Sequence, residues 1–99
     1  MPEVYFRVSW PDGREESCYS PSTVVLQHLT AGHSYPLADF LARSRLALTQ
    51  ASERVAAKYG YRCTSAEEQL ARLEEAAAAY ADRADAQVKV LSLEGAPAR

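Results

Sequence analysis

The chain has few of the residues and patterns on which many classes of protein depend. It carries only two cysteines among 99 residues, too few for a disulfide-stabilised scaffold. A bridge between Cys18 and Cys63 would need their Cα atoms to lie within about 7 Å, and we expect both thiols to be free in a reducing cytoplasm. No charged-then-apolar leader opens the sequence, so we expect no signal peptide. The longest apolar run is far short of the ~20 residues that a membrane-spanning helix needs.

Signatures of nucleic-acid binding and of catalysis are missing as well. The formal net charge is −2, with both signs spread along the chain, whereas a nucleic-acid binder needs a basic face to neutralise phosphates. The sequence shows no glycine-rich phosphate loop and no spacing typical of a catalytic carboxylate pair or of a Ser-His-Asp arrangement. We therefore expect no cofactor, no nucleic-acid partner and no membrane partner. A small local anion site is not excluded.

The chain does contain enough apolar residues to form one small hydrophobic core. Hydrophobic residues make up 47 % of the sequence, and a chain of this length buries roughly two-thirds of its unfolded surface. We expect a single domain over residues 1–94 and a disordered tail over residues 95–99. The sequence contains no internal repeat and no low-complexity segment.

A hairpin is predicted at the start of the chain. The segment 3–10 alternates as a half-buried strand does, with Val4, Phe6, Val8 and Trp10 on one side. A three-residue loop at 11–13, with glycine in the left-handed position, leads into a return strand over 14–19. This register places Cys18 opposite Phe6 and buries it. A two-residue loop would shift the pairing by one and turn Cys18 outward; we favour the first register.

Three helices and a last strand are predicted beyond the hairpin. Ser20 and Pro21 suit the cap and first position of a short helix, whose apolar side would be Val24, Val25 and Leu29. Residues 30–34 are expected to form a loop, and a long helix over 37–59 to end at Gly60. A third helix, with a capping box at 65–68, is predicted to run to about residue 82, and a strand to follow over 86–93.

These elements predict an α+β fold. A three-stranded sheet, made of the N-terminal hairpin and the C-terminal strand, would be covered on one face by the two longer helices. The inner stripe of the long helix is predicted from Leu37, Leu41, Leu48, Val55 and Tyr59, widened by Phe40, Ala47 and Ala51; that of the third helix from Leu70, Leu73, Ala77 and Tyr80.

The cysteines and histidines allow two chemical hypotheses. Cys18 lies two residues before a predicted helix start, and with His28 or His33 as base it would make a nucleophile. The favoured register instead buries the thiol as an inert small hydrophobe, which we consider the better interpretation. Cys18, His28, His33 and Cys63 have the right chemistry for zinc, but they lack the close paired spacing of structural sites, so no metal site is predicted.

Two surfaces are candidate binding sites. The start of the short helix, with Ser20, Ser22 and Thr23, offers hydroxyls and free N–H groups to an anion, and Arg43 or Arg45 on the long helix would add positive charge. Plain helix capping is the simpler explanation of the same residues. The other sheet face would carry Tyr5, Arg7 and Tyr19. It is either solvated or an interface, because tyrosine is enriched where proteins meet.

Three segments together resemble a known family. They are WPDGREESCYSPSTVV (10–25), YPLADFLARSR (35–45) and ASERVAAKYGYRC (51–63). The chain resembles the small nitrogen-starvation-response family of bacteria over nearly its whole length, and the tail after Leu93 is its least similar part.

The resemblance implies a genomic and metabolic context but no catalytic mechanism. Genes of this family typically lie in a cluster with a nitrilase of the carbon–nitrogen hydrolase type, beside a radical-SAM protein, an acetyltransferase, a flavoprotein and a synthase-like protein. Such clusters are linked to nitrogen scavenging, including growth on cyanide or nitriles. The resemblance gives no activity and no catalytic residue.

We expect a cytoplasmic accessory or binding protein of such a pathway, partnered by an enzyme of the nitrilase gene cluster. The alternatives are a small enzyme using Cys18 and a homo-oligomeric structural subunit such as a homodimer.

Overall fold

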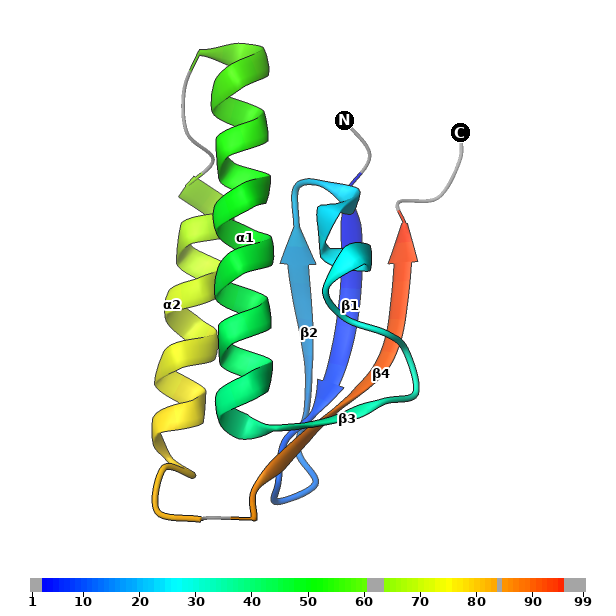
Figure 1. Cartoon of the computed structure of the whole chain (residues 1–99), viewed down its shortest axis with the longest axis vertical. Coiled ribbons are helices and arrows are strands. Elements are labelled where there is room, and N and C mark those ends of the chain that lie inside the picture. The colour runs from blue at the N-terminus through cyan, green and yellow to red at the C-terminus, as the bar shows by residue number, and fades with distance from the viewer. Residues whose placement is uncertain (1–2, 61–63, 84, 96–99) are drawn as a thin grey trace.

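The computed structural model describes residues 3–60, 64–83 and 85–95 and shows an α+β fold. The elements are β1 (Val4–Ser9), β2 (Glu15–Ser20), the 3₁₀ helix η1 (Thr23–Gln27), β3 (Ser34–Pro36), α1 (Leu37–Tyr59), α2 (Thr64–Ala78) and β4 (Gln87–Gly95). The strands form one antiparallel sheet in the order β2-β1-β4-β3. Figure 1 shows α1 and α2 side by side and antiparallel at one side of this sheet, with η1 in front of β1.

The hairpin has the three-residue loop and the favoured register. Phe6 pairs with Cys18 and Val8 with Glu16. The N–H of Gly13 donates to the carbonyl oxygen of Trp10 at 2.8 Å, and Gly13 has a φ of 91°, which glycine adopts without strain. Cys18 is 1 % exposed, so its predicted burial is confirmed.

The sheet has four strands, and the prediction of three was wrong. Residues 34–36 were expected to form the end of a loop and the opening of a helix, but they form β3, which pairs with β4. Three residues are too few to show an alternating pattern. The strand is held by its neighbours, because Tyr35 is buried and the N–H of Val90 donates to the carbonyl oxygen of His33 at 2.9 Å. Pro36 fits here because an edge strand does not need every N–H.

The short helix is a 3₁₀ helix, and its cap is not the expected one. Its N-cap is Ser22, whose side chain accepts from the N–H of Val24, whereas Ser20 was predicted to cap and is the last residue of β2. Val24 and Val25 disfavour a regular α-helix because their branched side chains lose freedom there. Both are buried, as is Leu29, so the predicted apolar side is confirmed.

Of the two long helices, α1 matches its predicted bounds and α2 differs at both ends. α1 has the predicted bounds and ends at Gly60, which is left-handed with a φ of 82°. Tyr59 is 48 % exposed and does not extend the buried stripe. α2 begins at Thr64 and ends at Ala78. Ser65 therefore lies inside its first turn and does not cap it, and Tyr80 reaches the core from the turn that follows.

The core lies between the inner face of the sheet and the helices. β4 contains a bulge, since Arg7 pairs with Ser92 but Val8 pairs with Val90, which leaves Leu91 as the extra residue. The bulge keeps Val90 and Leu93 on the inner side. Trp10 closes the lower end of the core by an edge contact with Phe40 and a stacked contact with Tyr80, with ring centroids 5.8 and 5.9 Å apart. Gly95 belongs to β4, and the rest of the predicted tail lies outside the described residues.

Candidate functional site

The serines at the start of η1 bond mainly to one another. Ser20 and Ser22 are 0 % and 2 % exposed. The hydroxyl of Ser20 donates to the carbonyl oxygen of Ser22 at 2.8 Å, and it accepts from the N–H of Ser22 at 3.3 Å. Ser22 Oγ in turn accepts from the N–H of Val24 at 3.3 Å. These hydroxyls close the turn from β2 into η1, while Thr23 is half-buried.

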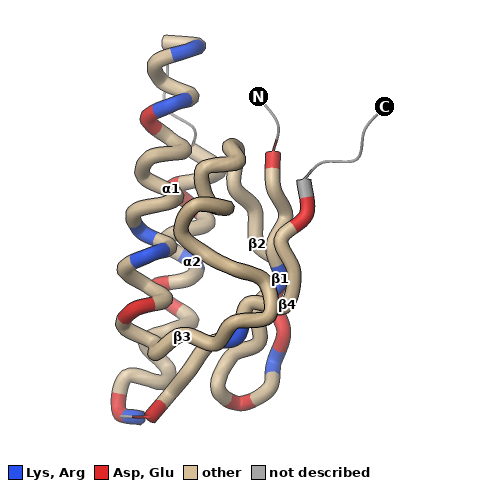
Figure 2. The backbone as a smooth tube through the Cα atoms, turned by 45° about the vertical axis from the view of Figure 1, so that its right-hand side comes forward, with Lys and Arg blue, Asp and Glu red and all other residues tan. Residues whose placement is uncertain are grey.

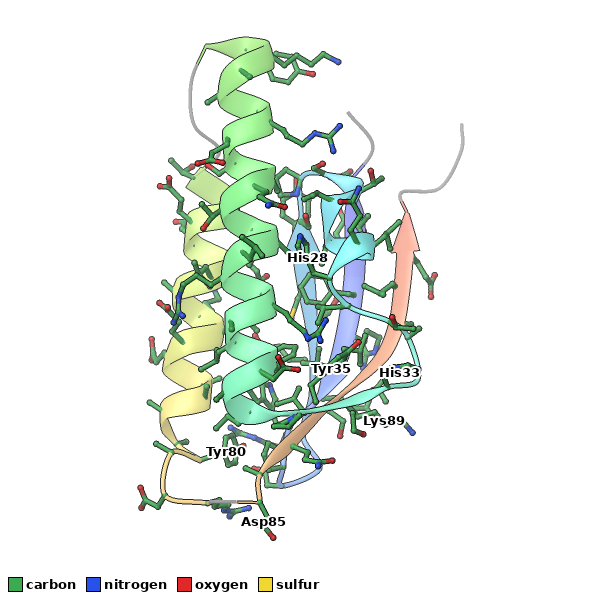
Figure 3. All side chains as sticks on the ribbon, viewed as in Figure 1. His28, His33, Tyr35, Tyr80, Asp85 and Lys89 are labelled. Atoms are coloured by element: carbon green, nitrogen blue, oxygen red, sulfur yellow. The ribbon has the colours of Figure 1, made fainter. Side chains whose placement is uncertain are left out.

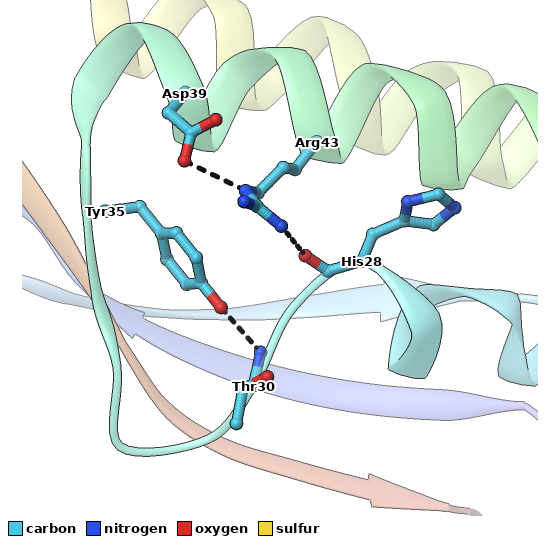
Figure 4. A network of polar contacts seen from close by, with 5 residues as sticks. All are labelled: His28, Thr30, Tyr35, Asp39 and Arg43. Carbon is cyan, nitrogen blue, oxygen red and sulfur yellow. Dashed lines mark hydrogen bonds and ion pairs between the residues drawn. The ribbon is translucent and has the colours of Figure 1, made fainter.

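Arg43 lies at the other end of η1 (Figure 4). Its Nε donates to Asp39 Oδ2 at 2.9 Å, and its Nη1 donates to the carbonyl oxygen of His28 at 3.0 Å. The guanidinium carbon stands 4.9 Å from the centroid of the Tyr35 ring, within the range of a cation–π contact. The hydrogen bond with Asp39 raises the pKa of Arg43 above its ordinary value. The side chain thus fastens α1 to the connection between η1 and β3.

Tyr35 fixes the same connection from the other side. Its hydroxyl accepts from the N–H of Thr30 at 2.9 Å, as Figure 4 shows.

No charged residue stands between Glu16 and Asp39 in the sequence, and Figure 2 shows this stretch as a long tan path from β2 through η1 to β3. The hydrogen bonds of Arg43 and Tyr35 therefore attach this uncharged connection to α1, which carries charged residues.

Arg45 lies at the seam between α1 and α2, away from both ends of η1. Its Nε and Nη2 donate to Glu74 Oε2 at 3.2 and 2.9 Å, so it bridges α1 and α2 on the outside of the helix pair. The contacts thus divide the five residues of the predicted anion site among the start of η1, its end, and the α1–α2 seam. The anion site stays a prediction.

Cys18 is held in a state that disfavours nucleophilic attack. Burial, with a smaller contribution from the charge of Glu16, raises the pKa of its thiol to about 12, whereas a nucleophilic cysteine needs a lowered pKa. The other cysteine, Cys63, lies outside the described residues.

The histidines are apart from one another. His28 Nε2 lies 2.9 Å from Gln50 Oε1 on α1. Figure 3 shows His33 near β3 and Lys89, away from His28, and its ring centroid lies 6.3 Å from that of Tyr35. Within residues 3–60, 64–83 and 85–95, no three His, Cys, Asp or Glu side chains gather in a way that could hold a metal ion. In the same ranges, no helix combines the length and the apolar character that crossing a membrane requires.

The outer sheet face brings together the three residues of the predicted interface. We call it the open face; it consists of Tyr5, Arg7, Ser9, Glu15, Ser17 and Tyr19 on β1 and β2. Tyr5 pairs with Tyr19 across the strands, and their ring centroids are 5.6 Å apart. Arg7 Nη2 lies 2.8 Å from Glu15 Oε1, and both side chains are about half exposed. The open face therefore combines an aromatic pair with an adjacent ion pair.

Gln69 is the polar residue that sequence reasoning missed. It lies on the inner side of α2 and is 6 % exposed, and its Oε1 accepts from the N–H of Tyr19 at 3.0 Å. Its Nε2 is buried without a hydrogen-bond partner. The one available signal was a glutamine between Ala66 and Leu73, at the spacing of the buried stripe.

Two hollows lie between α2 and the β1–β2 hairpin, and Gln69 lines the first of them. The first, about 220 Å³, is lined by Tyr19, Ser65, Glu68, Gln69 and Arg72. The second, about 360 Å³, is lined by Arg14, Glu16, Arg72, Glu75, Ala76 and Ala79. Arg72 borders both hollows. A further hollow of about 320 Å³ lies under the turns at the lower end, lined by Pro11, Arg83, Asp85, Ala86 and Gln87, and Figure 3 shows Tyr80 and Asp85 at this end.

Comparison with known proteins links the chain to a family model. A family model described as nitrogen starvation-induced protein NitG matches residues 5–93, from the first residues of β1 nearly to the end of β4. No curated protein and no solved structure matches the chain.

Proposed function

The chain belongs to the family of the nitrogen starvation-induced protein NitG, and from that premise we propose that it is an accessory binding protein of the bacterial nitrogen-starvation response. In this proposal it docks, in the cytoplasm, an enzyme encoded in the nitrilase gene cluster and so serves nitrile or cyanide assimilation. The docking surface is the open face. The observation that carries the proposal is the Tyr5–Tyr19 ring pair on the outer sheet face, in which Tyr5 is exposed and Tyr19 is half-buried.

The chemistry of the open face supports docking. Tyr5 is 44 % exposed, and a tyrosine ring offers a large contact area at low conformational cost. Its contact with Tyr19 orders the ring before a partner arrives. Tyrosine and arginine are the residues that most often dominate binding energy, and Arg7 lies on the same strand beside the pair.

The remaining polar residues of the open face suit the edge of an interface. The ion pair of Arg7 and Glu15 is half exposed, so a partner can replace or extend it without first exposing a buried charge. Ser9 and Ser17 leave the surface between the larger side chains low. The proposed partner therefore presents an apolar patch for the two rings, bordered by polar groups.

A pull-down from nitrogen-starved cells tests the proposal. The baits are the wild type, Tyr5→Ser and, as a matched control, Tyr59→Ser, since Tyr59 is a similarly exposed tyrosine on α1, with 48 % against 44 % exposure. We expect the wild type and Tyr59→Ser to recover an enzyme of the nitrilase gene cluster and Tyr5→Ser to lose most of it. If the wild type recovers none of these enzymes, or if both variants lose them equally, the proposal is wrong.

A further inference from the structure

The outer side of the sheet continues from the open face onto β4. Residues that pair directly across antiparallel strands lie on the same side of a sheet. Tyr5 pairs with Glu94 and Ser9 pairs with Lys89, and both charged residues are exposed. The residues on either side of Lys89 are 0 % exposed, so Lys89 itself points away from the core. The outer side of the sheet therefore carries two charges of β4 next to the open face.

These two charges have no partner within the part of the chain that the structure describes. Arg7 and Glu15 on the open face form an ion pair with each other, so their charges largely cancel. Neither Lys89 nor Glu94 forms an ion pair with another described residue. An exposed charge of this kind can pair with a group on another molecule without breaking a contact within its own chain.

Lys89 and Glu94 stand far apart along the same strand. β4 runs upward in Figure 1, so Glu94 lies near its upper end beside Tyr5, and Figure 3 shows Lys89 in the lower half of the sheet, near β3. Five residues of strand that include one bulge span about 13–16 Å. The outer side therefore has a negative charge beside the ring pair and a positive charge well away from it, which gives the surface a direction.

Resting on the proposed function, we propose that the docking surface for the partner enzyme extends across β1 onto β4, where Lys89 and Glu94 fix the orientation of the partner. The partner would present a basic side chain to Glu94, next to the apolar patch that receives the two rings, and an acidic side chain to Lys89 about 13–16 Å away. A partner docked the other way round would place like charges together, which is unfavourable. The rings of the open face then supply contact area, and β4 supplies selectivity.

The chain contains an internal control for the charge of Lys89. Lys58 and Lys89 are its two lysines, and both are exposed. Lys58 lies in the last turn of α1, which Figure 1 shows beyond the upper end of the sheet. Its Nζ is 5.6 Å from the centroid of the Tyr59 ring. A reagent or a substitution directed at lysine can therefore be compared between the proposed surface and a distant one.

Carbodiimide cross-linking of the complex pulled down from nitrogen-starved cells tests the contact at Lys89. The reagent joins an amine to a carboxylate in direct contact, as an amide and with loss of water. We expect mass spectrometry to find Lys89 joined to an aspartate or glutamate of an enzyme of the nitrilase gene cluster, and Lys58 not joined to it. Lys89→Arg should still recover the enzyme without this cross-link, because a guanidinium keeps the charge but does not form the amide.

The amount of enzyme recovered tests the role of the two charges. Lys89→Glu should recover about tenfold less enzyme than the wild type, and the difference should shrink as salt is added, because exposed charges are screened. Glu94→Lys should also lower the recovery. Lys58→Glu, the matched control, should recover as much enzyme as the wild type.

The outcomes distinguish this proposal from the proposed function. If the wild type recovers no enzyme of the cluster, the proposed function itself is wrong. If the wild type recovers the enzyme and Tyr5→Ser loses it, but Lys89 is not cross-linked to it or Lys89→Glu recovers as much as the wild type, the role of β4 is wrong and docking on the open face stands.

Two further outcomes are decisive. A cross-link from Lys89 to Glu94 of a second copy would show that this surface pairs with itself, which overturns the proposal. If circular dichroism shows that Lys89→Glu does not fold, the cross-link in the wild-type complex decides, because it requires no variant.

Discussion

The inner and open faces of the sheet come from alternate residues of the same strands and have opposite properties. On β1, Val4, Phe6 and Val8 are all 0 % exposed, whereas Tyr5 between them is 44 % exposed. The inner face is filled by η1, α1 and α2, and the open face carries paired rings and charges. Because successive side chains of a strand point to opposite sides, one register decides both faces. A slip of one residue would exchange the core for the proposed docking surface.

The buried side chains of the inner face stabilise the fold, whereas the side chains of the open face are available for binding. A fully buried aliphatic or aromatic side chain contributes about 1.5–3 kcal/mol by burial, while an exposed ion pair such as that of Arg7 and Glu15 contributes about 0–1 kcal/mol. The open face is therefore free to vary with its partner at little cost in stability.

Truncation of Phe6 should have the largest effect. Phe6→Ala removes a fully buried ring and should lower the free energy of unfolding by about 3–5 kcal/mol. Tyr5→Ala, one residue away on the open face, should change it by less than about 1 kcal/mol. Urea denaturation of both variants measures the contrast. Equal losses for the two variants would contradict the assignment of the faces.

Raising the pH should destabilise the inner face through Cys18. The pKa of this thiol is raised from 9.0 to about 12 in the folded state, so between these values the unfolded state releases the proton and is stabilised. The stability of the fold should then fall by about 1.4 kcal/mol per pH unit above pH 9, which makes about 2–3 kcal/mol by about pH 11. Below pH 9 this contribution is fully present.

Cys18→Ala isolates that contribution. The variant loses some packing at every pH, but its stability should depend less steeply on pH than that of the wild type, because the titrating thiol is gone. Urea denaturation at several alkaline pH values gives both slopes. Parallel slopes would show that burial does not hold this thiol protonated.

Loss of the η1 cap should have an intermediate effect. Ser22→Ala removes the side chain that accepts from the N–H of Val24, and it should cost about 1 kcal/mol in thermal or urea unfolding. Ser17→Ala on the open face is the control and should stay within about 0.5 kcal/mol of the wild type. A larger loss for Ser17→Ala than for Ser22→Ala would be inconsistent with the hydrogen bonds at the turn.

The smallest effect belongs to the ion pair of the open face. A double-mutant cycle with Arg7→Ala and Glu15→Ala should give a coupling of about 0–1 kcal/mol that shrinks as salt is added. The matched cycle on Arg45 and Glu74, another half-exposed pair, should give a similar value. A coupling for Arg7 and Glu15 well above that of the control pair would show that the open face contributes to folding.

Those parts of the fold that rest on local signals could be predicted from the sequence. Alternation in β1 and the glycine of the 11–13 loop give the hairpin and its register, and hence the residues of the open face. Pro36 and Gly60 give the exact ends of α1. β3 could not be predicted, since three residues carry no periodicity and the strand exists only because β4 lies beside it.

The candidate binding residues follow the same rule. Tyr5, Arg7 and Tyr19 share one sheet face because a hairpin relates them locally, and their role as an interface stays a prediction. Arg43 and Arg45 stand two positions apart on one helix, yet their partners, His28 and Glu74, come from different elements. Gln69 bonds to a residue 50 positions away. Such long-range choices depend on how the elements pack, which the sequence pattern does not reveal.

The pairing of β1 with β4 has a consequence for synthesis of the protein. Val4 lies opposite Gly95, so the two strands at the middle of the sheet are separated in sequence by β2, η1, β3 and both long helices. Contacts so distant along the chain close slowly, because a long loop must be ordered before they form. During synthesis the N-terminal hairpin therefore lacks its central neighbour in the sheet until β4 has been made.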